Sequence, residues 1–277
     1  QRVARTGESE GVVVLGETGS GKTHMLEFLS REFAIEPDPT LDYTPRPFVV
    51  LSVPTPCSPL DFSRAVLKSL GDPLRHRVRN ANASDRVRGL LTDCKVKFLA
   101  IDNFHDVPER RRTRGVDQVI TWVRELFDAV PAVYLLVGNG EADTVINSST
   151  QLKRRFPFQC RLQYQGVETE QQRREFAKLL FEIARRLPLA EQQSFVDHGF
   201  VSRAFYGTSG IIKYLVELFD HAWTLGLKQG REQLLVADFE AAFVAQHGQV
   251  PEGCNPFAAS FEPRLLNKPG EPFHVLV

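Results

Sequence analysis

The segment GETGSGKT at residues 16–23 constrains the fold of this chain more than any other feature. It follows an apolar run at residues 12–15 and precedes a stretch with helical character at residues 24–33. A glycine-rich loop between a strand and a helix turns successive backbone N–H groups inward, and the start of the helix adds the positive end of its dipole. Both features stabilise phosphate groups. The segment therefore predicts an α/β fold that binds a nucleoside triphosphate at the end of its first strand.

The residues of this loop have distinct predicted roles. Lys22 is expected to neutralise the β- and γ-phosphates, and Thr23 to offer its hydroxyl to Mg²⁺. The alternative, a strand–helix turn with a chance lysine, is disfavoured by the apolar strand and the helix on either side. We therefore predict ATP and Mg²⁺ as cofactors. The predicted contacts are Gly16, Glu17, Thr18, Gly19, Ser20, Gly21, Lys22, Thr23 and His24.

The composition is typical of a globular protein in a reducing compartment. Of the 277 residues, 42% are hydrophobic and 25% are charged, so the chain can bury a full core. The longest apolar runs, such as residues 133–137, are far too short to span a membrane, and the start of the chain has no secretory pattern. The four cysteines have no C-x-x-C spacing. These features predict a cytoplasmic protein with no membrane partner.

Positive and negative charges balance, but the arginines are clustered. The 34 lysines and arginines match 34 aspartates and glutamates, which by itself argues against a general affinity for nucleic acid. The clusters between predicted strands are Arg75, Arg77 and Arg79, then Arg86 and Arg88, and then Arg110, Arg111, Arg112 and Arg114. Such patches contact phosphates when several subunits place them side by side.

Predicted strands alternate with predicted helices, which is typical of a mostly parallel sheet covered on both faces. The strand candidates are residues 12–15, 48–53, 97–101, 132–137 and 158–163. From about residue 168 onward, apolar residues recur only at helical spacing. The predicted domains are a five-stranded α/β nucleotide-binding core at 1–167, a small helical lid domain at 168–248 and a C-terminal tail at 249–277. Among P-loop folds, a strand inserted between the two nucleotide motifs indicates the AAA+ class.

The second nucleotide motif ends the third predicted strand. The sequence FLAID closes with Asp102, so this carboxylate is expected at the carboxyl edge of the sheet, where ligands bind in open α/β folds. There Asp102 would hold Mg²⁺ together with Thr23, directly or through water. An ordinary aspartate at a strand end is the alternative, which the upstream P-loop makes less attractive.

Asn103 occupies the next position, where AAA+ proteins normally carry a glutamate that activates the attacking water. An amide can orient water by hydrogen bonding but cannot accept its proton. Hydrolysis is then either slow, with the protein acting as an ATP-dependent clamp, or supported by Asp106 or Glu109 from the following loop. We favour slow hydrolysis because neither carboxylate is at the expected position.

Four further residues occupy positions at which AAA+ proteins sense or contact nucleotide. Asn139 ends the fourth strand, where sensor 1 contacts the γ-phosphate or its water, although Asn-Gly is also a common turn. Arg154 and Arg155 precede the fifth strand, where an arginine finger reaches a neighbouring subunit, or where cations simply end a helix. Lys213 begins a helix in the sensor 2 region, although an exposed helical lysine is the simpler interpretation.

With these residues in place, the chain resembles the TniB/TnsC family of AAA+ transposition regulators, which includes the corresponding protein of CRISPR-associated transposons. The resemblance covers most of the chain. Its most specific segments are VVLSVPTPCSPLDFSRAVLKSLGDP, VGNGEADTVINSSTQLKRRF and, in the tail, NPF…LNKPGEPF. The resemblance implies a homo-oligomer that assembles with ATP on double-stranded DNA, as a ring or helical filament. It further implies that this assembly marks the insertion target and recruits the transposase, often with a TniQ-type targeting factor.

In such an assembly each subunit presents the same surface to the duplex, so a few arginines per subunit make many phosphate contacts without reading sequence. The candidate DNA-binding residues are Arg75, Arg77, Arg79, Arg110, Arg111, Arg112 and Arg114. Among them we favour Arg77, Arg79, Arg111 and Arg112, and the alternative for each is an arginine on a solvated face.

Two other functions stay open on the sequence alone. One is a replication-initiation or helicase-loading AAA+ ATPase with robust turnover, and the other is a P-loop oligomeric switch that never contacts DNA. ATP-dependent, salt-sensitive duplex binding would separate the switch from the transposition regulator and the replication-type ATPase. The rate of turnover would separate the regulator from the ATPase, because Asn103 departs from the glutamate of the family and predicts slow hydrolysis. The tail is too apolar for a simple disordered end and is expected to pack on the core or on a neighbour.

Overall fold

The computed structural model describes residues 3, 6–36, 38, 40–41, 43–107, 114–188, 195 and 197–274. The chain divides into two compact units, Gln1–Leu162 and Gln163–Val277, each with a hydrophobic core of its own. The first unit contains the P-loop and the aspartate motif, and the second is helical.

The first unit alternates strands and helices along the chain. Its elements are β1 (Glu10–Gly16), α2 (Lys22–Glu32), β2 (Phe48–Ser52), α3 (Pro59–Ser69), α4 (Asn80–Asp93), β3 (Phe98–Asp102), α5 (Arg114–Ala129), β4 (Val133–Gly138), α6 (Gly140–Ser148), α7 (Thr150–Arg155) and β5 (Phe158–Leu162). Short 3₁₀ helices at Arg75–Arg77 and Phe104–Asp106 precede α4 and follow β3. The strand ends differ from those predicted by only one or two residues.

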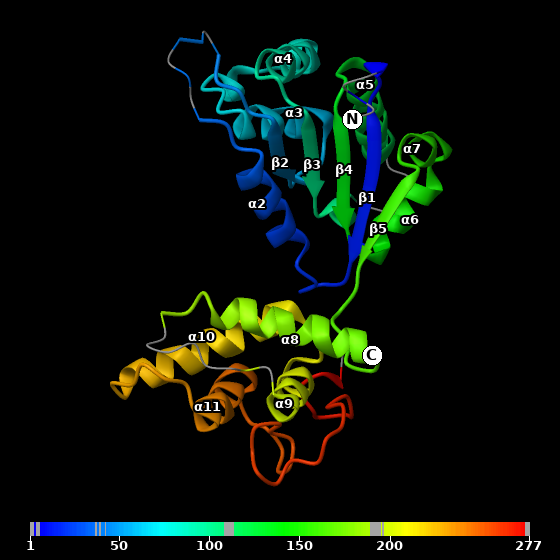
Figure 1. Ribbon diagram of the computed structural model, residues 1–277. Helices are drawn as coiled ribbons and strands as arrows, with labels where there is room; N and C mark the ends of the chain where they lie inside the picture. Colours follow the sequence, from blue (N-terminus) through cyan, green and yellow to red (C-terminus); the bar gives the residue numbers. More distant parts are fainter. Residues whose placement is uncertain are drawn as a thin grey trace. The chain divides into compact units, whose positions relative to one another are not determined.

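The described strands form one five-stranded parallel sheet in the order β2-β3-β4-β1-β5 (Figure 1). The central strand β1 pairs with β4 on one side and with β5 on the other, and Val13 lies opposite Leu136 and Gln159. Because all strands run in one direction, their carboxyl ends meet at a single edge. This edge brings together the loop after β1, the aspartate that ends β3 and the turn after β4.

Helices cover both faces of the sheet, as a buried parallel sheet requires. Successive strand residues point to opposite faces, so the core divides along each strand. Val13 and Leu15 of β1 belong to the larger core, together with residues of α3 to α7. Val14, between them, belongs to a smaller core with Leu26 of α2. Because β1 is buried on both faces, its sequence is apolar almost throughout.

The second unit is built from helices and the tail that follows them. Its helices in the described residues are α8 (Glu170–Ala184), α9 (His198–Thr208), α10 (Ile212–Lys228) and α11 (Val236–His247). The tail contributes the buried rings of Phe257, Phe261 and Phe273 to the same core as these helices. Within the tail, Arg264 donates two hydrogen bonds to the buried carboxylate of Glu271, at 3.0 and 2.6 Å. The tail thus packs as part of the helical unit.

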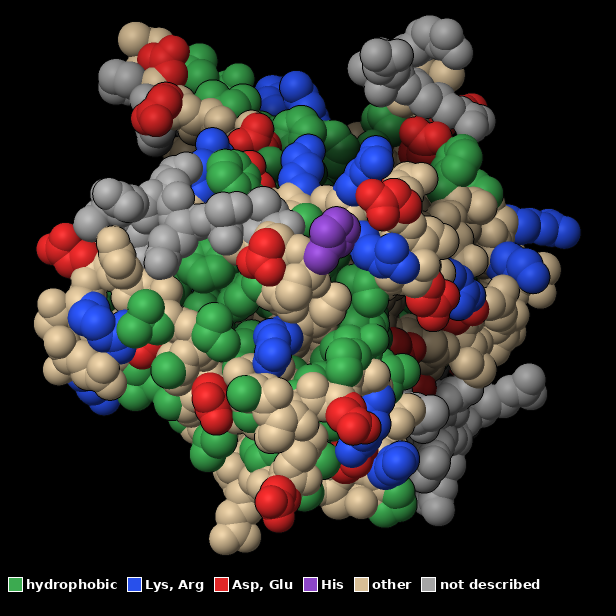
Figure 2. Space-filling model, turned by 60° about the horizontal axis from the view of Figure 1, so that its bottom comes forward, with side chains coloured by type: hydrophobic (Ala, Val, Ile, Leu, Met, Phe, Trp, Pro, Cys, Tyr) green, Lys and Arg blue, Asp and Glu red, His purple; other side chains and the backbone are tan. Residues whose placement is uncertain are grey.

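Charged side chains of both signs share the surface. In the view of Figure 2, basic and acidic side chains are interspersed, with hydrophobic side chains between them. This distribution is consistent with equal numbers of basic and acidic residues in the sequence. Across the part of the chain that the structure describes, every helix is too short or too polar to cross a membrane.

Candidate nucleotide-binding site

The loop between β1 and α2 has the backbone shape that a phosphate site needs. Gly19 and Gly21 have φ values of 84° and 94°, in the left-handed region that favours glycine. Gly21 is the N-cap of α2, and it leaves the first N–H groups of that helix without a side-chain cap. Uncapped N–H groups at a helix start carry partial positive charge and bind anions.

Two further observations fit a loop built for close approach. A Cβ added at Gly16 would lie 2.5 Å from Ser20 Oγ and 2.9 Å from the Leu162 carbonyl oxygen, so only glycine fits at this point. The Ser20 hydroxyl is buried and has no hydrogen-bond partner in the described structure. An unpartnered buried hydroxyl is unfavourable by roughly 1–3 kcal/mol. A bound phosphate oxygen could supply the missing partner.

Two backbone carbonyl oxygens of the loop hold the Lys22 side chain in place. Its Nζ donates hydrogen bonds to the carbonyl oxygens of Gly16, at 2.7 Å, and Glu17, at 3.0 Å. Burial lowers the pKa of the Lys22 ammonium, and the nearby carboxylates of Asp102 and Glu17 oppose this shift. A partly desolvated ammonium with two carbonyl partners can exchange them for phosphate oxygens at small cost in solvation.

The two predicted Mg²⁺ ligands touch each other. Thr23 Oγ1 donates to Asp102 Oδ2 at 2.9 Å, although the two residues are 79 positions apart in the sequence. Asp102 is buried, and its Oδ1 accepts a hydrogen bond from the Asn103 N–H at 2.8 Å. One hydroxyl and one carboxylate suit Mg²⁺, which takes its other ligands from phosphates and water. The described residues include no cluster of three or more His, Cys, Asp or Glu side chains that could hold a metal ion.

The turn after Asp102 has an unusual backbone. Asn103 has φ 57° and ψ 39°, a left-handed conformation that asparagine tolerates better than most residues. Phe104 and Val107 are fully buried and anchor the turn, and the carboxylate of Asp106 is exposed. Glu109, the other carboxylate considered for water activation, lies outside the described residues.

Asn139 caps α6 at the same edge of the sheet. Its Oδ1 accepts a hydrogen bond from the Glu141 N–H at 3.0 Å. No hydrogen bond of its Nδ2 group is found within the described residues. Since the oxygen accepts the capping hydrogen bond, the amide nitrogen is left to donate a hydrogen bond to a γ-phosphate or a water.

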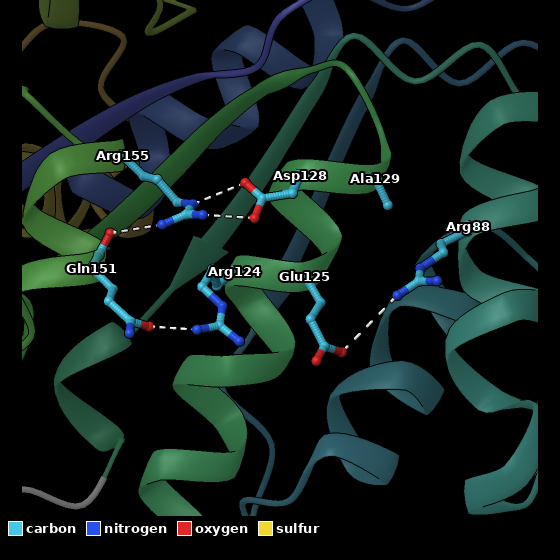
Figure 3. Close-up of a pocket in the computed structure, with 7 residues that line it drawn as sticks. All are labelled: Arg88, Arg124, Glu125, Asp128, Ala129, Gln151 and Arg155. Atoms are coloured by element: carbon cyan, nitrogen blue, oxygen red, sulfur yellow. Dashed lines mark hydrogen bonds and ion pairs between the residues drawn. The ribbon is translucent and has the colours of Figure 1, made fainter.

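The two candidate arginine fingers differ in their surroundings. They end α7, just before β5 begins, and therefore lie near the amino edge of the sheet rather than the P-loop edge. Arg155 forms two hydrogen bonds with Asp128, at 2.9 and 2.6 Å, and one with the Gln151 carbonyl oxygen at 3.2 Å. Figure 3 shows this pairing, with Arg124 turned toward the side chain of Gln151. Arg154 is exposed and has no partner among the described residues.

Arg155 and its partners border an open depression of about 520 Å³ between α4, α5 and α7. It is lined by Arg88, Arg124, Glu125, Asp128, Ala129, Gln151 and Arg155 (Figure 3). Most of its charges already have partners, because Arg155 pairs with Asp128 and Arg88 lies 4.0 Å from Glu125.

Comparison with known proteins identifies the chain. The sequence model of the family described as "Bacterial TniB protein" matches residues 2–164, more than half of the chain. This chain belongs to the TniB family. The resemblance noted from the sequence is thereby confirmed. No curated protein matches the sequence of this TniB-family member.

Solved structures show which fold the TniB-family chain adopts. The ORC2 protein of Aeropyrum pernix, in ADPNP and ADP complexes, is 15% identical with a TM-score of 0.64, over 91% of this chain and 65% of that one. The A. pernix ORC1 protein in complex with DNA is 12% identical with a TM-score of 0.55, over 89% and 62%. The Thermotoga maritima RuvB Holliday junction branch migration motor is 14% identical with a TM-score of 0.51, over 87% and 63%.

This likeness confirms the predicted AAA+ P-loop fold. At these identities it shows the fold alone, and the TniB-family chain spans less than two thirds of each of these chains.

The remaining predicted site residues of the TniB-family protein make other contacts or lie outside the described structure. Lys213 belongs to the second unit, where it is exposed and lies 3.8 Å from Glu217. His24 is exposed on α2 and lies 3.8 Å from Glu27. Neither contact indicates a role in nucleotide binding.

Of the predicted DNA-binding arginines, the structure describes the side chains of those before α4 but not of those around the start of α5. Arg77 ends the 3₁₀ helix before α4 and Arg79 is the N-cap of α4, and both are exposed. Arg75 is half-buried and donates to the Asp72 carbonyl oxygen at 3.3 Å. Arg114 begins α5, but its side chain is outside the described structure. The remaining candidates, Arg110, Arg111 and Arg112, lie outside the described residues.

Sequence reasoning missed one residue at the P-loop edge. His105 follows Asn103 by two positions, and its ring lies against Gly138, the residue before Asn139. The only sequence signal was a titratable side chain in the loop after the aspartate motif.

Proposed function

We propose that this TniB-family protein is an ATP-dependent regulator of transposition. In this proposal it oligomerises on double-stranded DNA as a ring or helical filament, marks the target site and recruits the transposase, with a TniQ-type targeting factor as a further partner. The observation that carries the proposal is the contact of Thr23 with Asp102 beside Lys22, in a chain of the TniB family. This arrangement suits a magnesium-bound triphosphate.

The residues of the P-loop edge would divide the work of binding ATP. The N–H groups at the start of α2 and the ammonium of Lys22 would hold the phosphates, and Thr23 and Asp102 would hold Mg²⁺. When bound, the ion would neutralise charge on the phosphates. The ADPNP and ADP complexes of the structurally similar ORC2 protein support nucleotide binding by this fold. With Asn103 in place of a glutamate, hydrolysis is slow, so ATP acts mainly to hold subunits together.

Assembly would follow from the difference between the two edges of the sheet. The P-loop edge of one subunit would face the α7 end of the next, where Arg154 has no partner among the described residues. A planar guanidinium suits a γ-phosphate across such an interface. A head-to-tail contact of this kind closes into a ring or continues as a filament.

DNA binding would rest on phosphate contacts repeated from subunit to subunit. Arg77 and Arg79 are exposed and available for this role, and Arg111 and Arg112 remain candidates from sequence. The complex of the structurally similar ORC1 protein with DNA supports a nucleic-acid partner for this fold. Backbone contacts alone predict binding without sequence preference and with a steep salt dependence.

Electron microscopy and duplex-binding assays, with and without ATP, test the proposal. The wild-type protein should form rings or filaments on duplex DNA only with ATP, and raising the salt concentration should weaken binding. Lys22→Ala should abolish this assembly, whereas Lys178→Ala, which removes an exposed lysine of α8, should not. A wild-type protein that stays monomeric and ignores DNA with every nucleotide would refute the proposal. Normal filaments with Lys22→Ala would remove the P-loop from the mechanism.

A replication-initiation or helicase-loading ATPase is the second candidate, favoured by the structural likeness to two ORC proteins. It differs from the first in turnover. Rapid ATP hydrolysis by the wild-type protein, without stable filaments, would favour this second function.

A further inference from the structure

The imidazole of His105 has an unsatisfied nitrogen at the nucleotide edge of the sheet. Its Nδ1 is buried and has no hydrogen-bond partner within the described structure. The turn that carries His105 is fixed by the fully buried side chains of Phe104 and Val107 and by the hydrogen bond from the Asp106 N–H to the Asn103 carbonyl oxygen, at 2.8 Å. A buried nitrogen without a partner is unfavourable, so its persistence in a rigid turn calls for a ligand or a water.

The ring lies against the turn that presents Asn139, one of the two asparagines expected to orient the attacking water. A Cβ added at Gly138 would be 3.3 Å from both the Nδ1 and the backbone nitrogen of His105. Asn139 follows Gly138 directly, and Asn103 precedes His105 by two positions. Gly138 has no room for a side chain, since the same Cβ would lie 2.5 Å from the Ala142 Cβ. The imidazole therefore packs directly on the turn that presents Asn139.

The second ring nitrogen determines which chemistry Nδ1 can perform. His105 Nε2 lies 3.8 Å from Asp106 Oδ1, close enough for electrostatic attraction but too far for a hydrogen bond. A neutral imidazole carries one N–H and one bare nitrogen, and a carboxylate beside Nε2 favours the proton there. Nδ1 is then an acceptor.

We propose that His105 orients and deprotonates the water that attacks the γ-phosphate, in place of the glutamate that Asn103 replaces. This inference rests on the proposed ATP binding. As the water oxygen bonds to the γ-phosphorus, the bond from that phosphorus to the β,γ-bridging oxygen breaks and ADP leaves with this oxygen. One proton of the water passes to Nδ1 and then to solvent, and the other stays on the phosphate.

Three variants and one spectrum test the inference. His105→Phe keeps the ring without nitrogens, His105→Asn keeps a polar atom near the Nδ1 position, and His105→Gln moves it toward the Nε2 position. We expect His105→Phe and His105→Gln to lose about 100-fold in the rate of phosphate release, and His105→Asn to retain an intermediate rate. Affinity for a non-hydrolysable ATP analogue should stay within about twofold of wild type in all three, because none of them changes a phosphate contact.

A nitrogen-detected NMR spectrum of the ¹⁵N-histidine-labelled wild-type protein gives a readout that does not depend on activity. With His105 assigned by comparison with His105→Asn, the spectrum should show the proton on Nε2 and a bare Nδ1. A proton on Nδ1, or a wild-type rate in His105→Phe, would overturn the inference. Analogue binding without any wild-type hydrolysis would also overturn it while leaving the proposed ATP-dependent clamp intact. Failure to bind the analogue would instead refute the proposed function.

Discussion

Replacing Asn103 with glutamate changes both the chemistry and the stability of the nucleotide edge. Asn103 sits at φ 57° and ψ 39°, where residues other than glycine, asparagine and aspartate are disfavoured by about 1–2 kcal/mol. Because asparagine itself bears part of this strain, Asn103→Glu should lower the free energy of unfolding by about 1 kcal/mol. In a unit of this size, that corresponds to a fall in Tm of about 2–4 °C.

The same substitution supplies the carboxylate that the site lacks. A positioned general base accelerates proton transfer by about 10²–10⁴, so Asn103→Glu should raise the rate of ATP hydrolysis by about 100-fold in the His105→Phe background, and by less where His105 is present. Asn103→Gln is the matched control, since it has the same length and the same backbone strain without the charge. It should lower the Tm equally and leave the rate of hydrolysis unchanged. Asn103→Gly should remove the strain and raise the Tm slightly.

Phosphate release and scanning calorimetry, measured on the same preparations, check both effects. An equal rate increase in Asn103→Gln would show that the carboxylate is not responsible. A wild-type protein that already hydrolyses several ATP molecules per second would contradict the clamp interpretation. In the Asn103→Glu background, His105→Phe should have little further effect, because the glutamate would then take the proton.

Three further experiments test the interface, the DNA surface and the tail. Arg154→Ala should impair ATP-dependent assembly more than Arg155→Ala, because Arg155 is already paired with Asp128 of its own subunit. If electron microscopy showed an equal loss of assemblies in both variants, this prediction would be wrong. Arg77→Ala with Arg79→Ala should weaken binding to all duplexes alike and flatten the salt slope by about two, and an unchanged slope would exclude these arginines from the interface. The hydrogen bonds from Arg264 lower the pKa of Glu271 from 4.5 to about 2. The stability that this carboxylate contributes is therefore complete above pH 4.5 and is lost as the pH falls toward 2. Glu271→Gln should lower the Tm at neutral pH and remove this part of the acid dependence, and parallel profiles of Tm against pH for variant and wild type would contradict this role of Glu271.

The sequence determined the elements whose cause is local. The apolar run before GETGSGKT, the period of the helices and the carboxylate that ends FLAID each act within a few neighbouring residues. They were sufficient to predict the five strands to within two residues and the AAA+ class of the fold. Glycines in the loop between β1 and α2 were expected from the same pattern, and two of them have the positive φ that the loop needs.

What sequence could not determine depends on contacts between distant parts of the chain. Arg154 and Arg155 are adjacent and chemically identical, and only the packing of α5 against α7 brings Asp128 to one of them. The left-handed backbone of Asn103 and the approach of His105 to Gly138 likewise arise where a turn after β3 meets the end of β4. The phenylalanines of the tail are apolar in any fold, and it is the tertiary structure that buries them among α8 to α11. Local patterns specify which elements form, whereas the partner of a given side chain is decided by how those elements pack.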